Sequence, residues 1–172
     1  MQKRHTDRES YFDEQSQTSK NYYIPYIKEV IGHIPDKVLE VGCGEGGNLL
    51  PFAKAGCRVM GVDIDAMRIE QARTFFTQRH QQGQFIATDI FQLEDKATNF
   101  PLILLHDVIE HIRDKERFLS GLQKHLSADG AVFVGFPAWQ MPFGGHQQIA
   151  HSHIVHISLF STSFPALYTD GY

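Results

Sequence analysis

Short, largely apolar runs alternate with segments of helical periodicity along most of this chain. A run of five or six such residues is too short for an ordinary helix and suits a strand that is buried on both faces. These runs occupy residues 37–41, 58–62, 84–88, 101–106 and 131–136. Helical spacing comes before the first run, at residues 22–34, and helical spacing or helix caps come between the later runs at residues 49–55 and 66–79 and after Asp114. The alternation predicts an α/β fold in which a mostly parallel sheet lies between two layers of helices.

Composition and charge exclude several classes of protein. The 172 residues are 42% hydrophobic and 21% charged, which is typical of one globular domain and not of a disordered chain. A net charge of -4 gives no basic surface for nucleic acid or an anionic membrane. No apolar run approaches the roughly 20 residues that span a bilayer, and the polar N-terminus lacks the apolar segment of a signal peptide. With only two cysteines, we expect a cytoplasmic protein without a disulfide framework.

The two ends of the chain differ in composition from its middle. Residues 1–20 are polar, and we expect a loosely held N-terminal arm there, although Tyr11 and Phe12 could pack against the domain. Residues 21–150 carry the alternating pattern and should form the ligand-binding domain. Residues 151–172 are dense in His, Ser and Thr, and only His153–Phe160 resembles a strand. We therefore expect an irregular tail that contains one strand at most.

The first two predicted strands end in residues that suit a nucleotide-type ligand. The first strand runs into a glycine-rich turn over residues 42–47. Glycines let the backbone turn sharply and approach a ligand, and free N–H groups at the start of the next helix favour an anionic group. The second strand ends in Asp63, 21 residues after Gly42, where a carboxylate can accept both hydroxyls of a ribose. Asp65 is better placed as the N-cap of the following helix.

Two further strand ends carry polar side chains that should face the same ligand. The third strand ends at Asp89 and Ile90, which could accept a hydrogen bond from an adenine amino group and pack on its ring. The fourth strand runs into the segment His106–His111, which holds two histidines and two carboxylates. Histidine exchanges protons near neutral pH, so either histidine could act as a general base. Glu110 and Asp114 have a competing role at the start of the next helix.

Five segments together resemble the class I S-adenosylmethionine-dependent methyltransferases, most closely the branch that acts on small molecules and includes quinone-pathway O-methyltransferases. They keep the order and spacing of that family over roughly residues 35–137 and comprise Val38–Gly46, Gly61–Asp65, Ala87–Ile90, His106–His111 and Leu126–Val134. The resemblance implies a Rossmann-like three-layer sandwich in which residues 21–150 bind S-adenosylmethionine. It also implies methyl transfer to an unidentified small-molecule acceptor, with S-adenosylhomocysteine as the product.

By that resemblance, the cofactor contacts fall at the ends of the first four strands. The glycines pass close to the methionyl part, Glu40 holds the loop and reaches the amino group, and Asp63 takes the ribose hydroxyls. Hydrophobic and acidic residues after the second and third strands recognise adenine, and the fourth strand lines the end nearest the methyl group. The implied set is Glu40, Gly42, Cys43, Gly44, Gly46, Asp63, Ile64, Asp89, Ile90, His106 and Asp107.

Catalysis of this kind needs few protein groups. A sulfonium is already an activated methyl donor, so in-line displacement mostly needs positioning and a desolvated pocket. A base is needed only if the acceptor must lose a proton, and the candidates are His106, His111 and His146 in no order. No metal site is expected in the histidine-rich tail, because its histidines do not share one strand face and no Cys or carboxylate lies near them.

Two other functions fit parts of the sequence. A nicotinamide-dependent oxidoreductase suits the glycine pattern with Asp63, although Glu40 would then lie beside a pyrophosphate. A catalytically impaired or truncated cofactor-binding domain is the second. Relatives continue after the fifth strand with a helix and two strands, whereas only 36 residues follow Phe136 here. We therefore expect a sheet shortened at the C-terminus, with an uncovered edge that would favour a homodimer.

Overall fold

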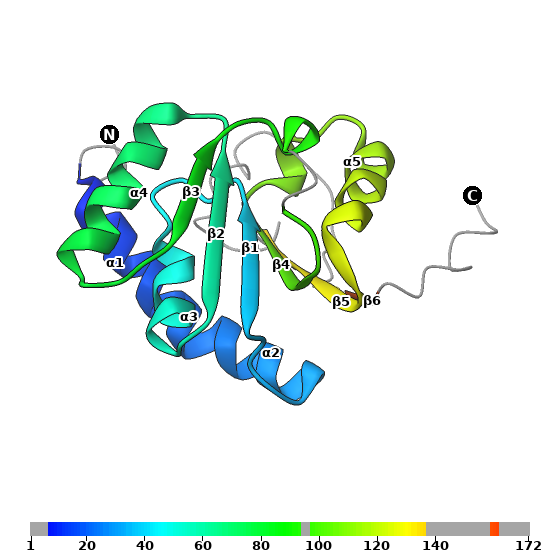
Figure 1. Ribbon diagram of the computed structural model, residues 1–172, viewed down its shortest axis with the longest axis horizontal. Coiled ribbons are helices and arrows are strands. Elements are labelled where there is room, and N and C mark those ends of the chain that lie inside the picture. Colours follow the sequence, from blue (N-terminus) through cyan, green and yellow to red (C-terminus); the bar gives the residue numbers. More distant parts are fainter. Residues whose placement is uncertain (1–6, 94–96, 137–158, 162–172) are drawn as a thin grey trace, which may run out of the picture.

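The computed structural model describes residues 7–93, 97–136 and 159–161 and shows a sheet between helices (Figure 1). The strand order is β3-β2-β1-β4-β5-β6. The first five strands pair in parallel, and the sixth pairs antiparallel with β5. Their bounds are β1 Lys37–Val41, β2 Arg58–Asp63, β3 Gln84–Ala87, β4 Phe100–His106, β5 Leu126–Gly135 and β6 Leu159–Ser161. The predicted α/β class with a mostly parallel, Rossmann-like sheet is confirmed.

Helices connect the strands and cover both faces of the sheet (Figure 1). The α-helices are α1 Arg8–Thr18, α2 Ile24–Ile31, α3 Leu50–Lys54, α4 Ala66–Gln78 and α5 Lys115–Leu122. A π-helical turn, η2 Ser19–Tyr23, joins α1 to α2. Short 3-10 turns are η3 Gly47–Leu49, η4 Ile90–Gln92, η5 Ile109–His111 and η6 Gln123–His125. The predicted N-caps are confirmed. Asp65 accepts hydrogen bonds from the amides of Met67 and Arg68, and Asp114 accepts one from the amide of Arg117.

Side chains of each strand alternate between two hydrophobic cores, one on each face of the sheet. In β1, Val38 packs with α1, α2, α3 and α4, whereas Leu39 and Val41 pack on the opposite face with α5. Strands that are covered on both faces must be apolar almost throughout, which explains the continuous apolar runs in the sequence.

The strand order reverses beside β1, and this reversal determines where a ligand can bind. The chain moves outward from β1 to β2 and β3, then returns to place β4 on the other side of β1. The connections therefore diverge at the carboxyl ends of β1 and β4 and leave a crevice there, which is the usual ligand site of an open α/β sheet.

The expected loose arm over residues 1–20 is wrong from Asp7 onward, because Arg8–Thr18 forms α1. Asp7 caps this helix by accepting from the Ser10 amide. The aromatic ring of Phe12 is fully buried, with its centroid 5.0 Å from Phe75 and 6.3 Å from Phe76. One buried aromatic side chain on a polar helix thus packs α1 against α4, and the arm and the domain form one unit.

Phe12→Ala is expected to destabilise the protein by about 3 kcal/mol or more, because the change opens a cavity where the ring was fully buried. The measurement is chemical denaturation, followed by circular dichroism. Tyr22→Ala is the matched control, since Tyr22 is 68% exposed and its loss should cost no more than about 0.5 kcal/mol. Equal stability of the two variants would show that α1 does not contribute to the folded core.

The outer edge of β5 is partly paired. Residues Ala131–Phe133 of β5 pair with β6. The prediction of an uncovered edge is therefore wrong over these positions. The uncovered edge was the argument for a homodimer, so these positions no longer support one. β6 overlaps only the end of the predicted strand His153–Phe160, and residues 153–158 lie outside the described residues. β5 itself begins at Leu126 instead of residue 131, because the predicted turn at residues 129–130 is an irregularity within the strand opposite Phe100–Leu102.

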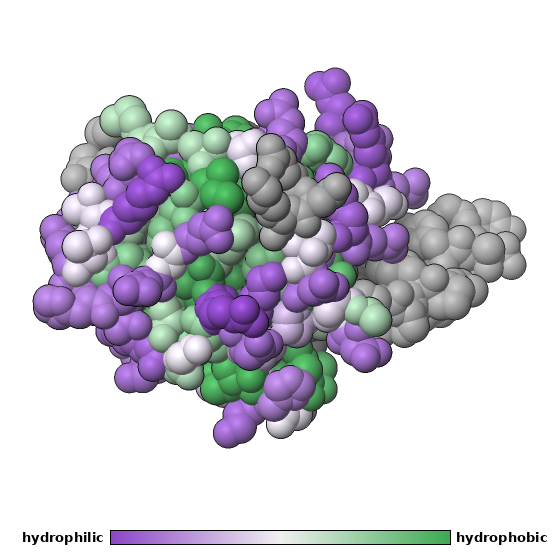
Figure 2. Space-filling model, in the orientation of Figure 1, coloured by the Kyte–Doolittle hydropathy of each residue, from purple (hydrophilic) through white to green (hydrophobic). Residues whose placement is uncertain are grey.

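The surface is mostly hydrophilic, with an apolar area over α2 at the lower edge of the view in Figure 2. Tyr22, Tyr26 and Val30 follow one another at a spacing of four residues and are 68%, 38% and 52% exposed. Within α2, this spacing places Tyr26 and Val30 on one helix face. Among the described residues, no helix has both the length and the apolar composition to cross a membrane.

Candidate active site

The glycine-rich loop leaves β1 through a backbone that only glycine adopts easily. Gly42, Gly44 and Gly46 have φ values of +71°, +52° and +81°. Residues other than glycine are strained in this left-handed region because they carry a Cβ. The amides of Gly42 and Cys43 both donate to the carbonyl of Val62, at 2.8 and 3.1 Å, which ties the loop to the end of β2. The loop is therefore held in a fixed curve before any ligand binds.

Gly42→Ala is expected to destabilise the protein by about 3 kcal/mol or more. The new Cβ would be strained at positive φ and would also overlap Cγ2 of Val108, which follows β4. Gly56→Ala is the matched control, because Gly56 has φ +90° but nothing within 4 Å of a new Cβ. Its cost should be only about 1 kcal/mol. Thermal denaturation measures the difference, and equal losses would show that the loop tolerates the overlap.

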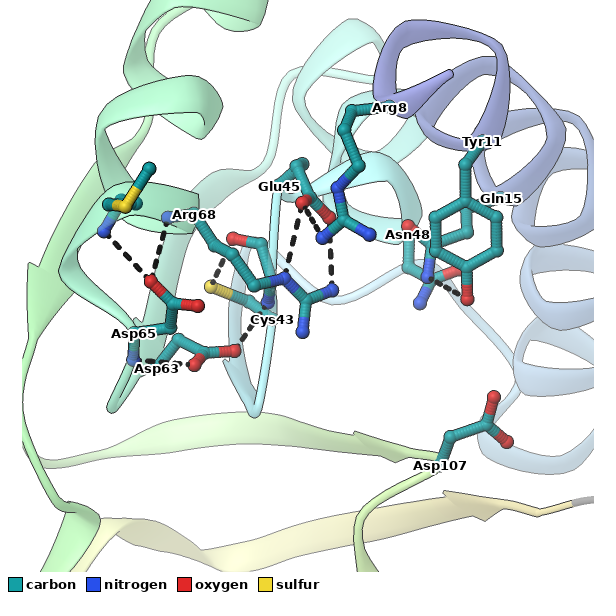
Figure 3. A network of polar contacts seen from close by, with 12 residues as sticks. Arg8, Tyr11, Gln15, Cys43, Glu45, Asn48, Asp63, Asp65, Arg68 and Asp107 are labelled. Atoms are coloured by element: carbon teal, nitrogen blue, oxygen red, sulfur yellow. Dashed lines mark hydrogen bonds and ion pairs between the residues drawn. The ribbon is translucent and has the colours of Figure 1, made fainter. Parts of the chain in front are cut away.

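Asp63 ends β2 with both carboxylate oxygens held by backbone N–H groups. Oδ2 accepts from the Gly44 amide at 2.8 Å, and Oδ1 accepts from the Asp65 amide at 2.9 Å (Figure 3). The residue is only 7% exposed, yet it lines a cavity at the carboxyl ends of the first four strands. Two fixed hydrogen bonds leave the remaining lone pairs of this carboxylate in a defined orientation, which suits recognition of adjacent hydroxyl groups.

The residues predicted to contact adenine also reach the cavity. Ile64 is 81% exposed at its mouth, and Ile90 is buried. Asp89 lines the cavity and accepts from the Phe91 amide at 2.9 Å, so this carboxylate caps η4 as well. Phe91, which the sequence analysis did not single out, lies beside them and is 43% exposed.

Glu40 is a buried acid directly behind the glycine-rich loop. Its side chain is 1% exposed, and Oε1 accepts from Nδ2 of Asn48 at 2.8 Å. Oε2 is buried and has no hydrogen-bond partner among the described residues. Burial raises the pKa of Glu40 to about 8, and Asp63 adds to the rise, while the Asn48 hydrogen bond and Arg68 oppose it. An unpaired buried acceptor of this kind is suited to a cationic donor.

The end of β4 brings together His106, Asp107 and Tyr23. His106 Nδ1 lies 3.7 Å from Asp107 Oδ2, and the His106 ring lies 5.7 Å from the Tyr23 ring. Asp107 adopts a left-handed backbone with φ +53°, which turns the chain sharply after the strand. Burial raises the pKa of Tyr23 above its ordinary value, and Asp107 and Glu40 add to the rise. Tyr23 therefore keeps its hydroxyl proton at neutral pH.

One cavity of about 520 Å³ collects most of these residues. Of the predicted set, it is lined by Gly42, Asp63, Ile64, Asp89, Ile90, Asp107 and His111. Glu40, Cys43, Gly44, Gly46 and His106 are not among its lining residues, and His146 lies outside the described residues. The lining also includes residues that the sequence analysis missed, namely Arg68, Phe91, Val108, Ile112 and Phe118. Within the described ranges, no cluster of His, Cys, Asp and Glu is suited to hold a metal ion.

A family model described as a methyltransferase domain matches residues 39–132, which hold the glycine-rich loop, Asp63 and the end of β4. The chain belongs to this methyltransferase family. The matched segment contains more than half of the chain, with the end of β1 and all of β2, β3 and β4. This match favours the methyltransferase hypothesis over a nicotinamide-dependent oxidoreductase.

Similar proteins agree with the family assignment. The ubiquinone biosynthesis O-methyltransferase of Bartonella quintana is 33% identical over 118 residues, which make up 66% of this chain and 48% of that protein. This methyltransferase domain thus spans about half the length of the curated relatives that it matches. The plantazolicin methyltransferase BpumL with SAH has a TM-score of 0.64 at 21% identity, covering 79% of this chain and 51% of BpumL. PKMT2 from Rickettsia typhi in complex with AdoHcy has a TM-score of 0.59 at 27% identity, and the match covers 67% of this chain and 25% of PKMT2.

Proposed function

We propose that this methyltransferase domain binds S-adenosylmethionine and transfers its methyl group to a small-molecule acceptor. The observation that carries the proposal is the convergence of three strand ends on one cavity. Gly42 follows β1, Asp63 ends β2 and Asp89 follows β3, and all three line it. Its volume of about 520 Å³ is in the range of small-molecule sites. The family match and the relatives crystallised with SAH support the same ligand.

The residues present fit the parts of this cofactor. Asp63 would accept the ribose hydroxyls, because backbone N–H groups already orient its carboxylate. Ile64, Ile90 and Phe91 would pack on adenine, with Asp89 at its edge. Glu40 Oε2 is the buried acceptor without a partner, and it would receive the cationic amino group. The pyrophosphate of a dinucleotide carries no cationic donor for this oxygen.

The protein's share of the reaction is positioning and proton transfer. The bound sulfonium supplies an activated methyl group, so the protein must align an acceptor and exclude water. The name of the curated relatives favours a hydroxyl acceptor, which must lose a proton. His111 lines the cavity with its side chain 63% exposed, whereas His106 lies beside Asp107 with 19% exposed. We propose His111 or His106 as the base; His146 stays a prediction from the sequence.

Calorimetric titration with S-adenosylhomocysteine is the first test, with NADH titrated in parallel. We expect micromolar binding of S-adenosylhomocysteine and none of NADH. A panel of phenols and catechols with radiolabelled S-adenosylmethionine then tests transfer. Binding without transfer to any acceptor would favour the alternative, a catalytically impaired cofactor-binding domain. A folded protein that binds only NADH would overturn the proposal.

Cytoplasmic location is part of the same proposal. Cys43 and Cys57 are free and buried, which suits a reducing compartment. Fractionation of cells that express the tagged chain tests this directly, and recovery in the membrane pellet after a salt wash would contradict it.

A further inference from the structure

Glu45 is a fully buried carboxylate in the glycine-rich loop, and none of the roles proposed above uses it. Its side chain is 0% exposed. Oε1 accepts from Arg68 Nε at 3.1 Å and Oε2 accepts from Arg68 Nη2 at 2.9 Å, which makes a two-point ion pair with α4. Nη2 of Arg8, the first residue of α1, also donates to Oε1. The loop is therefore held by charge from two helices that are distant in sequence (Figure 3).

Arg68 lies directly against the glycine-rich loop. A Cβ on Gly44 would overlap the Arg68 guanidinium, so this group occupies the space where other residues carry a side chain. On its other side, Gly44 donates its amide proton to Asp63 Oδ2 at 2.8 Å. Gly44 is thus held between Asp63 and Arg68, and both of these side chains line the cavity.

α1 is held next to this ion pair by further contacts. Arg79, the C-cap of α4, donates to Glu9 at 3.1 Å and to Asp13 at 2.7 Å, and its guanidinium lies 4.9 Å from the ring centroid of Phe12. These contacts fix the helix that carries Arg8. The position of α1 is therefore linked to the loop through Arg8 and Glu45.

We propose that Arg68 is a positioning residue for the cofactor, which acts through Glu45 to hold the glycine-rich loop against Asp63, and that Arg8 extends this hold to α1. The inference rests on the proposed function. Without Arg68, the buried Glu45 carboxylate loses its two-point partner, and the loop must move to solvate it. Lysine keeps the charge at position 68 but not the planar fork.

The test is the dissociation constant for S-adenosylhomocysteine, measured by calorimetry at low salt. Arg68→Met should weaken binding roughly tenfold or more, since small displacements of a binding loop have large effects. Arg68→Lys should weaken binding less, by roughly threefold to tenfold. The double variant Arg68→Met/Glu45→Gln should bind no more weakly than Arg68→Met alone, because the two residues act as a unit. Arg58→Met is the matched control, since its pair with Asp36 is exposed, and it should leave the constant unchanged.

Two readouts separate positioning from a general loss of structure. The KM for S-adenosylmethionine should rise in Arg68→Met while kcat at saturation stays near the wild-type value, and the Gly44 amide should exchange faster with deuterated water. Wild-type affinity in folded Arg68→Met would overturn this inference and leave the proposed function intact. If Arg68→Met does not fold, unchanged affinity in Arg68→Lys and Glu45→Gln would overturn it instead. No binding by the wild-type protein would overturn the proposed function itself.

Discussion

Asp63→Ala is expected to lower the affinity for S-adenosylhomocysteine by about 100-fold or more. The carboxylate would contribute hydrogen bonds to two ribose hydroxyls, and each such bond to a charged group contributes about 1.5–3 kcal/mol. The change also leaves the Gly44 and Asp65 amides without their acceptors. Both the hydrogen bonds that hold the loop against Asp63 and the contact with the ribose should therefore be lost.

Calorimetric titration measures this loss, with circular dichroism as the check on folding. Asp63→Asn keeps the shape but not the charge, and it should lie between the wild type and alanine. Asp114→Ala is the matched control, because this exposed aspartate caps α5 through one backbone contact and does not line the cavity. It should bind S-adenosylhomocysteine as the wild type does. Folded Asp63→Ala with affinity within about fivefold of wild type would exclude the ribose role.

Glu40 should make folding stability fall as the pH rises. Burial raises its pKa from 4.5 to about 8 in the folded state, so the folded protein keeps a proton that the unfolded chain has released. Between pH 4.5 and 8 the unfolded state binds fewer protons, and stability is lost as pH increases. The contribution of this group is at most about 5 kcal/mol. Glu40→Gln, which cannot titrate, should be more stable than the wild type at pH 8.5 and no more stable at pH 5.

Cofactor binding should release this proton. At pH 7 most of Glu40 is protonated in the free protein, and a cationic amino group beside Oε2 would favour the carboxylate. Calorimetry in buffers of different ionisation enthalpy should show nearly one proton released per S-adenosylhomocysteine at pH 7. Glu40→Gln should release almost none and should bind more weakly. Equal proton release by both proteins would show that Glu40 does not receive the amino group.

The strands and their ends could be predicted because local sequence determines them. Runs such as residues 37–41 and 58–62 are too short and too apolar to be anything but buried strands in a chain of this composition. Parallel pairing then brings the carboxyl ends together, so the sequence alone places Gly42, Asp63 and Asp89 at one site, and all three line the cavity. Asp65 could be separated from Asp63 because a helix begins directly after it.

Features that depend on long-range packing could not be predicted. α1 has almost no apolar periodicity, since its buried residues are only Phe12 and Gln15, and its burial depends on α4. The pair of Glu45 with Arg68 joins residues 23 positions apart, and nothing in either neighbourhood indicates the other. β5 was predicted too short because Asp129 and Gly130 are typical of turns, whereas Leu126 and Ala131 on either side of them both pair with β4 and the strand continues through an irregularity.

The π-helical turn η2 lets the helical segments before and after it bury side chains in the same hydrophobic core. A π turn holds one residue more than an α turn and so arises from a single insertion. Here Ser19 Oγ donates to the Asn48 carbonyl at 2.8 Å, with Phe12 buried before the turn and Ile27 after it. A regular α-helix with the same number of residues would rotate the second half by about 100° relative to the first. The extra residue of the π turn is therefore what keeps Phe12 and Ile27 in a phase that buries both, and deleting the exposed Asn21 should restore α-helix while leaving both side chains in the core.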